Sequence, residues 1–201
     1  KKIFHWAIDI GKAASDNKIA GIHSNIWLRL KTRIARLLVL DKIKNIFGGN
    51  IRCMLTSAAP ISKEIIHFFN WAGLEVYEAY GMTETSGVIT TQSEGKTRIG
   101  SVGLPIKGTE IKIMEDGEIC CRGEQNIKGY YKNQEATNEL LRPDDEGGFW
   151  LHTGDVGHVD EDGYLFITDR KKDIIITAGG KNVAPQNIEN LMKTSPYISQ
   201  A

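Results

Sequence analysis

With 201 residues, the chain is long enough for one large domain or for one domain and part of a second. Its 25 basic and 25 acidic residues give a formal net charge of zero, which lends no support to a nucleic-acid partner held by phosphate neutralisation. Its apolar runs, such as residues 174–176, are far shorter than the roughly 20 residues of a membrane-spanning helix, and its first residues do not resemble a signal peptide.

The three cysteines do not form a disulfide framework, since two of them, Cys120 and Cys121, are adjacent. We therefore expect reduced thiols in a cytoplasmic protein. A metal site built from Cys120, Cys121 and a histidine is the alternative, but plain strand positions are favoured because no second spaced pair accompanies them. The chain begins at Lys1, without an initiator methionine, and stops just after an expected helix, so we expect a piece of a longer protein.

The first fifty residues predict helices. Ile3, Trp6 and Ile10 recur at helical spacing, and Gly11 marks the expected exit of this helix. Residues 26–46 again place apolar side chains on one face, with arginines and lysines mostly off it. These basic residues suit a solvated helix face, which is the favoured interpretation, or peripheral contact with an anionic membrane surface.

From Gly48 onward, short strands are expected to alternate with helices. The expected elements are a buried strand, a helix and a second strand, at residues 51–56, 63–72 and 74–79. Ser62 is a good N-cap for the helix, and Gly73 ends it. This order predicts a mainly parallel sheet with helical crossovers, in which ligands bind at the carboxyl ends of strands.

The part after Gly95 predicts glycine-punctuated β structure. The expected elements are four strands at residues 109–114, 118–122, 155–159 and 164–168, and a helix at residues 134–141. We expect a small barrel or a distorted sheet. The charged run 169–173 predicts a linker, and the strand 173–177 and a helix after Pro185 are too little to bury a core of their own.

The segment 80–84, Tyr-Gly-Met-Thr-Glu, follows the second expected strand. The ring of Tyr80 offers a flat face for a purine, and Gly81 lets the backbone approach a ligand. Thr83 can bond a phosphate, and Glu84 can offer a hard oxygen to Mg²⁺. Judged only by residue type, the segment fits an ordinary turn better than a nucleotide site.

This segment resembles the Tyr-Gly-x-Thr-Glu signature of the adenylate-forming superfamily, which comprises acyl-CoA synthetases, peptide-synthetase adenylation domains and beetle luciferases. The resemblance implies that Tyr80 stacks on adenine, that Thr83 contacts the α-phosphate and that Glu84 binds Mg²⁺. Upstream, Ser57, Ala58 and Ala59, followed by a proline, are similar to the family's adenine loop. Ser57 departs from the glycine that usually leads this loop.

Residues 150–155, Trp-Leu-His-Thr-Gly-Asp, are similar to a second family motif, whose aspartate accepts hydrogen bonds from both ribose hydroxyls. The resemblance implies this role for Asp155. A carboxylate suits a vicinal diol because it only accepts hydrogen bonds and has two oxygens to offer. Without the neighbouring motifs, an aspartate in a β-turn would be the default interpretation.

Residues 168–175 are similar to the linker of long-chain acyl-CoA synthetases. The resemblance implies that Arg170 contacts the ribose or phosphates and that Lys172 is the hinge around which a small C-terminal domain rotates. Lys171 is assigned to solvated linker. Gly179 and Gly180 resemble the loop that lines the pantetheine channel, and one of them is expected to contact CoA.

Taken together, the resemblance implies an internal fragment of an AMP-forming long-chain fatty acyl-CoA synthetase with an α/β fold. Residues 1–94 would form the helical and adenine-binding part of the AMP-binding domain, residues 95–169 its β-rich subdomain, and residues 170–201 the hinge and the start of the α+β C-terminal domain. Thr83, Glu84 and Lys172 are the expected catalytic residues.

The implied partners are ATP, a fatty acid, CoA and Mg²⁺, in a cytoplasmic protein that is either free or at the inner face of the membrane. Acyl chain length and oligomeric state are not readable from the sequence. No phosphate loop or C-terminal catalytic lysine is present, so we expect the chain alone to bind nucleotide weakly at most. Two alternatives remain: an aryl- or amino-acid-adenylating enzyme of the same fold, and a non-catalytic nucleotide-binding module.

Overall fold

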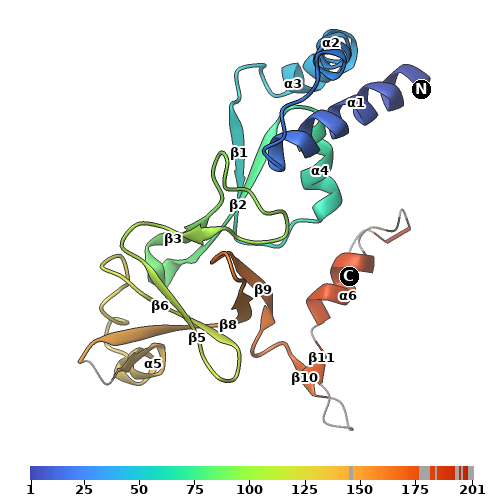
Figure 1. Cartoon of the computed structure of the whole chain (residues 1–201). Helices are drawn as coiled ribbons and strands as arrows, with labels where there is room; N and C mark the ends of the chain where they lie inside the picture. Colours follow the sequence, from blue (N-terminus) through green and yellow to red (C-terminus); the bar gives the residue numbers. More distant parts are fainter. Residues whose placement is uncertain (145–146, 177–181, 184, 193–194, 196, 199–201) are drawn as a thin grey trace. The chain divides into compact units, whose positions relative to one another are not determined.

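The computed structural model describes residues 1–144, 147–176, 182–183, 185–192, 195 and 197–198. It consists of two compact units (Figure 1). The first comprises Lys1–Glu78 and Ser93–Ile99, and the second comprises Ala79–Gln92 and Gly100–Ala201. The predicted segments 1–94, 95–169 and 170–201 follow other boundaries and stay a prediction about domain organisation.

The first unit is mainly helical. Its elements are α1 (Lys2–Ile19), α2 (Ile26–Ala35), the π-helical turn η1 (Arg36–Leu40), α3 (Asp41–Ile46), β1 (Cys53–Thr56), α4 (Lys63–Trp71) and the first half of β2 (Glu75–Met82). The predicted helix over residues 26–46 is confirmed as the continuous run from α2 to α3. Ser62 caps α4 as predicted, because its hydroxyl accepts the N–H of Ile65.

Gly11 does not end the first helix, as we had expected, but lies in the middle of α1. A methyl group at this position would overlap the carbonyl oxygen of Trp71, the last residue of α4. Gly11 therefore allows α1 and α4 to approach closely. A small core cluster of Ala7, Ala35 and Leu40 joins α1 to α2 and η1.

The first β pairing is parallel, as predicted, because α4 provides the crossover between β1 and β2. Strand β1 is not buried, however: its side chains alternate, and Leu55 is 60% exposed. The second half of β2 pairs antiparallel with β3. The reason is that only a short 3₁₀ turn separates these two strands, too little chain for a crossover.

The second unit is built on antiparallel β structure. Its elements are the second half of β2, η2 (Thr83–Thr85), β3 (Gly87–Thr91), β4 (Leu104–Pro105), β5 (Glu110–Ile113), β6 (Glu118–Arg122), α5 (Gln134–Leu140), β7 (Leu141–Pro143), β8 (Phe149–Val159), β9 (Leu165–Arg170), β10 (Ile175–Ile176), β11 (Asn182–Val183) and α6 (Pro185–Met192). Its five-stranded sheet has the order β5-β6-β8-β7, with β9 also paired to β8.

The predicted α/β class is confirmed, with two corrections to its detail. Parallel pairing is restricted to β1 and β2 among the strands that the structure describes, so the sheets are mixed and antiparallel. The β-rich part is a distorted sheet rather than a closed barrel in its described residues, with register shifts where β6 pairs with β8 and where β8 pairs with β9. Its core contains Tyr80, Ile89, Ile119, Cys121, Leu140, Leu151 and Leu165.

Candidate nucleotide site

The signature segment 80–84 lies at the end of β2 and in the turn η2. The strands β2 and β3 change register between Tyr80 and Gly81, and a methyl group at Gly81 would overlap the carbonyl of Gly87. Gly81 thus allows two strands to approach, which is a local reason for glycine besides the predicted approach to a ligand. Thr85 stabilises the turn, since its hydroxyl accepts the N–H of Met82 at 3.0 Å and donates to the carbonyl of Gly87 at 2.7 Å.

Three predicted site residues are brought together in the second unit. The hydroxyl of Tyr80 donates to Oδ2 of Asp155 at 2.6 Å, and Nε of Arg170 lies 3.3 Å from Oδ1 of the same carboxylate. Asp155 and Arg170 face each other across the pairing of β8 and β9. These three side chains, which are 75 and 15 residues apart in sequence, therefore form one hydrogen-bonded set.

The three members of this set differ in burial. Tyr80 is only 8% exposed and its ring belongs to the core, whereas the Arg170 side chain is 69% exposed. Burial and the neighbouring Asp155 carboxylate raise the pKa of Tyr80 well above its ordinary value, so its hydroxyl remains a donor. The predicted stacking of Tyr80 on adenine stays a prediction.

Glu84 is held by a residue that the sequence did not single out. The hydroxyl of Tyr130 donates to Oε1 of Glu84 at 2.7 Å, and the N–H of Ile127 donates to its backbone carbonyl at 2.8 Å. The hydrogen bond to Glu84 raises the pKa of Tyr130 to about 12. Oε2 of Glu84 accepts no hydrogen bond from the described residues, so this oxygen is open to a cation, as the prediction of a Mg²⁺ ligand requires.

Glu118 and Lys171 form an ion pair next to Asp155 that we did not predict. The Lys171 ammonium lies 2.6 Å from Oδ2 of Asp116 and 3.0 Å from Oε2 of Glu118. Lys171 is exposed and follows β9, as its assignment to solvated linker requires, but its ammonium is also ion-paired to the sheet. The predicted linker also begins later than expected, because β9 continues to Arg170 and Asp169 is 3% exposed.

Among the described residues, one group of side chains corresponds to the alternative of a cysteine–histidine metal site. Glu118, Cys120 and His152 place potential ligand atoms within 4.8 Å of one another, while Cys121 is not part of this group. Burial raises the pKa of the Cys120 thiol to about 12, and the Lys171 ammonium already contacts the Glu118 carboxylate. Both facts favour a hydrogen-bonded network over metal binding.

The remaining predicted residues lie elsewhere. Ser57, Ala58 and Ala59 are exposed in the loop after β1 and belong to the first unit, and Ala58 has a left-handed backbone with φ of 73°. Thr83 and Lys172 are exposed. Gly179 and Gly180 are outside the described residues.

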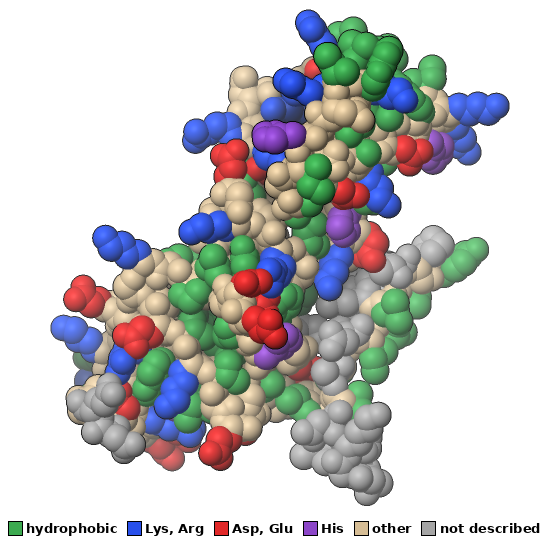
Figure 2. Space-filling view, in the orientation of Figure 1, with side chains coloured by type: hydrophobic (Ala, Val, Ile, Leu, Met, Phe, Trp, Pro, Cys, Tyr) green, Lys and Arg blue, Asp and Glu red, His purple; other side chains and the backbone are tan. Residues whose placement is uncertain are grey.

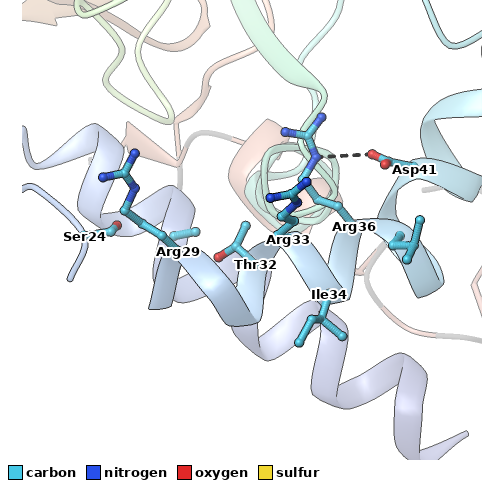
Figure 3. Close-up of a pocket in the computed structure, with 9 residues that line it drawn as sticks. Ser24, Arg29, Thr32, Arg33, Ile34, Arg36 and Asp41 are labelled. Carbon is cyan, nitrogen blue, oxygen red and sulfur yellow. Dashed lines mark hydrogen bonds and ion pairs between the residues drawn. The ribbon is translucent and has the colours of Figure 1, made fainter. Parts of the chain in front are cut away.

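A pocket of ≈ 680 Å³ lies in the first unit and contains none of the predicted site residues. Arg29, Arg33 and Arg36 come from α2 and η1 and line its wall, with Nε of Arg36 3.2 Å from Oδ1 of Asp41 (Figure 3). Hydrophobic and basic side chains gather on the helical part of this unit (Figure 2). Among the helices described, none is long and apolar enough to cross a membrane.

The family model of the AMP-binding enzymes matches residues 25–131. Long-chain-fatty-acid–CoA ligase FadD15 of Mycobacterium bovis is 44% identical over 176 residues, which cover 88% of this chain and 28% of that protein. The putative fatty-acid–CoA ligase fadD11 of Mycobacterium tuberculosis is 42% identical over 195 residues, covering 96% of this chain and 34% of that protein. The chain thus spans about a third or less of these curated relatives.

Solved structures of related enzymes have the same fold. The O-succinylbenzoate coenzyme A synthetase of Bacillus subtilis in complex with AMP matches with a TM-score of 0.69 and 30% identity, over 83% of this chain and 36% of that one. The anthranilate CoA ligase AuaEII in complex with anthranoyl-AMP matches with a TM-score of 0.65 and 26% identity, over 74% of this chain and 30% of that one. These matches confirm the resemblance to adenylate-forming enzymes.

Proposed function

We propose, from the premise that this chain belongs to the AMP-binding enzyme family, that it is the part of a long-chain fatty acid–CoA ligase that holds the ribose and phosphates of ATP. In this reaction the fatty carboxylate attacks the α-phosphorus of ATP and pyrophosphate leaves. The CoA thiol then attacks the acyl carbon of the adenylate, and AMP leaves.

The hydrogen-bonded set of Tyr80, Asp155 and Arg170 carries this proposal. A carboxylate has about four lone-pair sites, so Asp155 can accept two ribose hydroxyls while it keeps the hydroxyl of Tyr80. Among the described residues, Arg170 hydrogen-bonds Asp155 through Nε and its terminal amino groups bond no side chain, which leaves both for phosphate oxygens.

The turn η2 supplies the phosphate side of the proposed site. Thr83 offers an exposed hydroxyl to the α-phosphate. Glu84 offers Oε2 to Mg²⁺, a cation that proteins commonly bind through one or two carboxylates together with substrate phosphates. When bound there, Mg²⁺ supplies positive charge that stabilises the phosphate oxygens.

The finer assignments belong to the same proposal. Ser57, Ala58 and Ala59 form the adenine loop, Lys172 is the hinge, and Gly179 or Gly180 contacts CoA. Lys172→Pro would restrict φ at the hinge and should slow thioester formation more than adenylate formation. Equal slowing of the two half-reactions would contradict the hinge role.

The test uses the natural protein that carries this chain. Pyrophosphate release is measured with fatty acids of increasing length and with aromatic acids, because the solved aryl–CoA ligases make an aryl acid the second candidate substrate. The identities of 44% and 42% to fatty acid ligases support a fatty acid. Turnover of aromatic acids alone would overturn the fatty-acid assignment, and no acid-dependent turnover would indicate a non-catalytic nucleotide-binding module.

A matched pair of variants tests the site. Asp155→Asn replaces one acceptor oxygen with a donor and should raise the KM for ATP by about tenfold or more. Asp162→Asn makes the same change in the exposed turn between β8 and β9 and should leave the KM within about twofold. Equal KM values in both variants would remove the ribose role of Asp155.

Cytoplasmic localisation with peripheral membrane contact is a separate part of the proposal. Arg29 and Arg33 are exposed on α2 and have no ion-pair partner among the described residues, and another face of the same helix carries Trp27, which is 70% exposed. A helix with exposed guanidinium groups and an exposed indole suits an anionic lipid surface. Sedimentation with phosphatidylserine vesicles but not with phosphatidylcholine vesicles is expected, and Arg29→Gln with Arg33→Gln should abolish it. Equal sedimentation of the variant would exclude this contact.

A further inference from the structure

The carboxylate of Glu118 is a buried junction at the start of β6. It is 4% exposed and is contacted by three groups: the N–H of Gly154 at 3.1 Å from Oε1, and Nδ1 of His152 and Nζ of Lys171, each at 3.0 Å from Oε2. Burial of a charged carboxylate is strongly unfavourable unless hydrogen-bond and ion-pair partners satisfy its oxygens, as these three groups do here. Glu118 thus joins β6, β8 and the end of β9.

Gly154, the residue before Asp155, is held on one side by this junction and on the other by the backbone of Lys171. The N–H of Gly154 bonds Glu118, and its carbonyl accepts the N–H of Lys171 at 2.8 Å. Gly154 has a φ of 74°, so the chain turns at this residue in a conformation that favours glycine. The direction of β8 at Asp155 is therefore determined by the Glu118 carboxylate, which the Lys171 ammonium contacts, and by the backbone N–H of Lys171.

A second contact supports the same turn. The hydroxyl of Thr153 donates to the carbonyl of Ile119 at 2.8 Å and accepts the N–H of Asp155 at 3.1 Å. The backbone on both sides of Gly154 is thereby tied to β6. Small rotations of this backbone would displace the Asp155 carboxylate, and misplacement of a binding group by about 1 Å can reduce the rate about 100-fold.

Lys171 also lies at the boundary between the sheet and the following segment. Arg170 before it is still part of β9, and Lys172 after it is exposed with no polar contact among the described residues. The Lys171 ammonium bridges Asp116, in the turn between β5 and β6, and Glu118, at the start of β6. The side-chain contacts with the sheet thus end at Lys171, while the backbone N–H groups of Asp173 and Ile174 bond the carbonyl of Arg170 at 3.0 and 3.2 Å.

We infer that Glu118 and Lys171 are positioning residues that hold the ribose carboxylate Asp155 in place and fix the stationary side of the hinge at Lys172. The inference deepens the proposed function and rests on it for the roles of Asp155 and Lys172. Neither Glu118 nor Lys171 touches substrate. The two adjacent lysines then have different tasks: Lys171 anchors the linker, and Lys172 turns.

The test uses the natural protein with Lys171→Met, Lys171→Arg and Glu118→Gln, and with Lys107→Met as the control. Lys107 is exposed in the same unit and has no polar contact among the described residues. Lys171→Met and Glu118→Gln should raise the KM for ATP about tenfold with a smaller effect on kcat, because the ribose site is displaced. Lys171→Arg should restore the KM to within about threefold, because it keeps the positive charge.

Amide hydrogen exchange of the segment 149–157 provides a readout without activity. Lys171→Met and Glu118→Gln should speed exchange in this segment, while Lys107→Met should not. Unchanged exchange and an unchanged KM in Lys171→Met would overturn the inference. So would a Lys171→Arg variant as impaired as Lys171→Met, or a fall in kcat without a change in KM.

The two proposals fail in distinguishable ways. If the wild-type protein adenylates no acid, the proposed function fails, and AMP affinity then replaces the KM for ATP. Faster exchange together with about tenfold weaker AMP binding in Lys171→Met would uphold the positioning role. Faster exchange with unchanged AMP affinity would reduce the pair to a structural contact and overturn the inference.

Discussion

The hydroxyl of Tyr80 is the buried donor to Asp155, and Tyr80→Phe removes this group while it keeps the ring in the core. A hydrogen bond to a charged group contributes about 1.5–3 kcal/mol to stability. Water cannot easily replace the donor, since the Asp155 side chain is only 12% exposed. Its other partner, Arg170, is 69% exposed, so solvent screens that ion pair and it compensates little. We expect a loss of about 2 kcal/mol, or about 30-fold in the unfolding equilibrium.

Urea unfolding followed by tryptophan fluorescence measures this loss. Trp150 lies in β8, the strand that also carries Asp155, with the guanidinium of Arg122 4.8 Å from its ring, so it reports on this unit. The midpoint should fall while the m-value stays unchanged. Tyr131→Phe is the matched control, because Tyr131 is 88% exposed, and it should change stability by less than about 0.5 kcal/mol. Equal stability of the two variants would refute the reasoning.

The same position separates stacking from hydrogen bonding. Tyr80→Phe keeps an aromatic face, so an adenine stack survives in it, whereas Tyr80→Leu removes the face and keeps an apolar side chain. AMP should therefore bind Tyr80→Leu more weakly than Tyr80→Phe. Equal AMP affinity in these two variants would remove the stacking role that the signature implies.

Three further predictions follow from the site. Gly81→Ala should lower the free energy of unfolding by at least about 2 kcal/mol, because the added methyl group would overlap the facing strand. Gly108→Ala has open space around it but a φ of 85°, so it should lower this free energy by about 1 kcal/mol. Equal losses of stability in urea unfolding would contradict this. Glu84→Gln should lower the pKa of Tyr130 from about 12 toward 10, seen as earlier tyrosinate absorbance at 295 nm, and an unchanged titration would contradict it. Burial acts to raise the pKa of Glu118, but its hydrogen bonds to His152 and Lys171 prevail and hold this pKa below 4.5. The contribution of Glu118 to stability is therefore present above pH 4.5 and is lost as the pH falls through the lowered pKa. Glu118→Gln should reduce the loss of stability at acidic pH, and the same loss in the variant and the wild type would contradict this.

The ends of a helix could be predicted from the sequence where a single residue determines them. Ser62 and Gly73 mark the two ends of α4, and Gly73 has the left-handed backbone that this role needs, with a φ of 82°. The prediction that Gly11 ends the first helix was wrong, because glycine is needed at this position for the close contact with Trp71 of another helix. A single sequence shows the glycine but not the helix that approaches it, so a packing glycine and a helix exit look alike.

The candidate site likewise combines residues that the sequence alone singles out with residues that only tertiary contacts reveal. Its motif residues could be predicted because each carries a recognisable chemical group in a recognisable order. Their supporting residues could not: Tyr130, Glu118 and Lys171 occur in stretches where a tyrosine, a glutamate or a lysine is ordinary on any surface. Only the antiparallel pairing of β6, β8 and β9 shows that Glu118 and Lys171 meet beside Asp155.

The register of β8 against β9 explains why Arg170 rather than Asp169 faces Asp155. Gly157 pairs with Ile167, and continuing that register would place Asp169 opposite Asp155, two like charges on one face of the sheet. A register shift between Val156 and Gly157 moves the pairing by one residue, so Asp155 meets Arg170 and Val156 meets Asp169. The hydroxyl of Thr168, which lies within the shift, donates to the carbonyl of Val156 at 3.0 Å. One irregular residue in β9 therefore replaces a repulsive pair with the ion pair on which the proposed nucleotide site depends, and bulges commonly redirect side chains in this way.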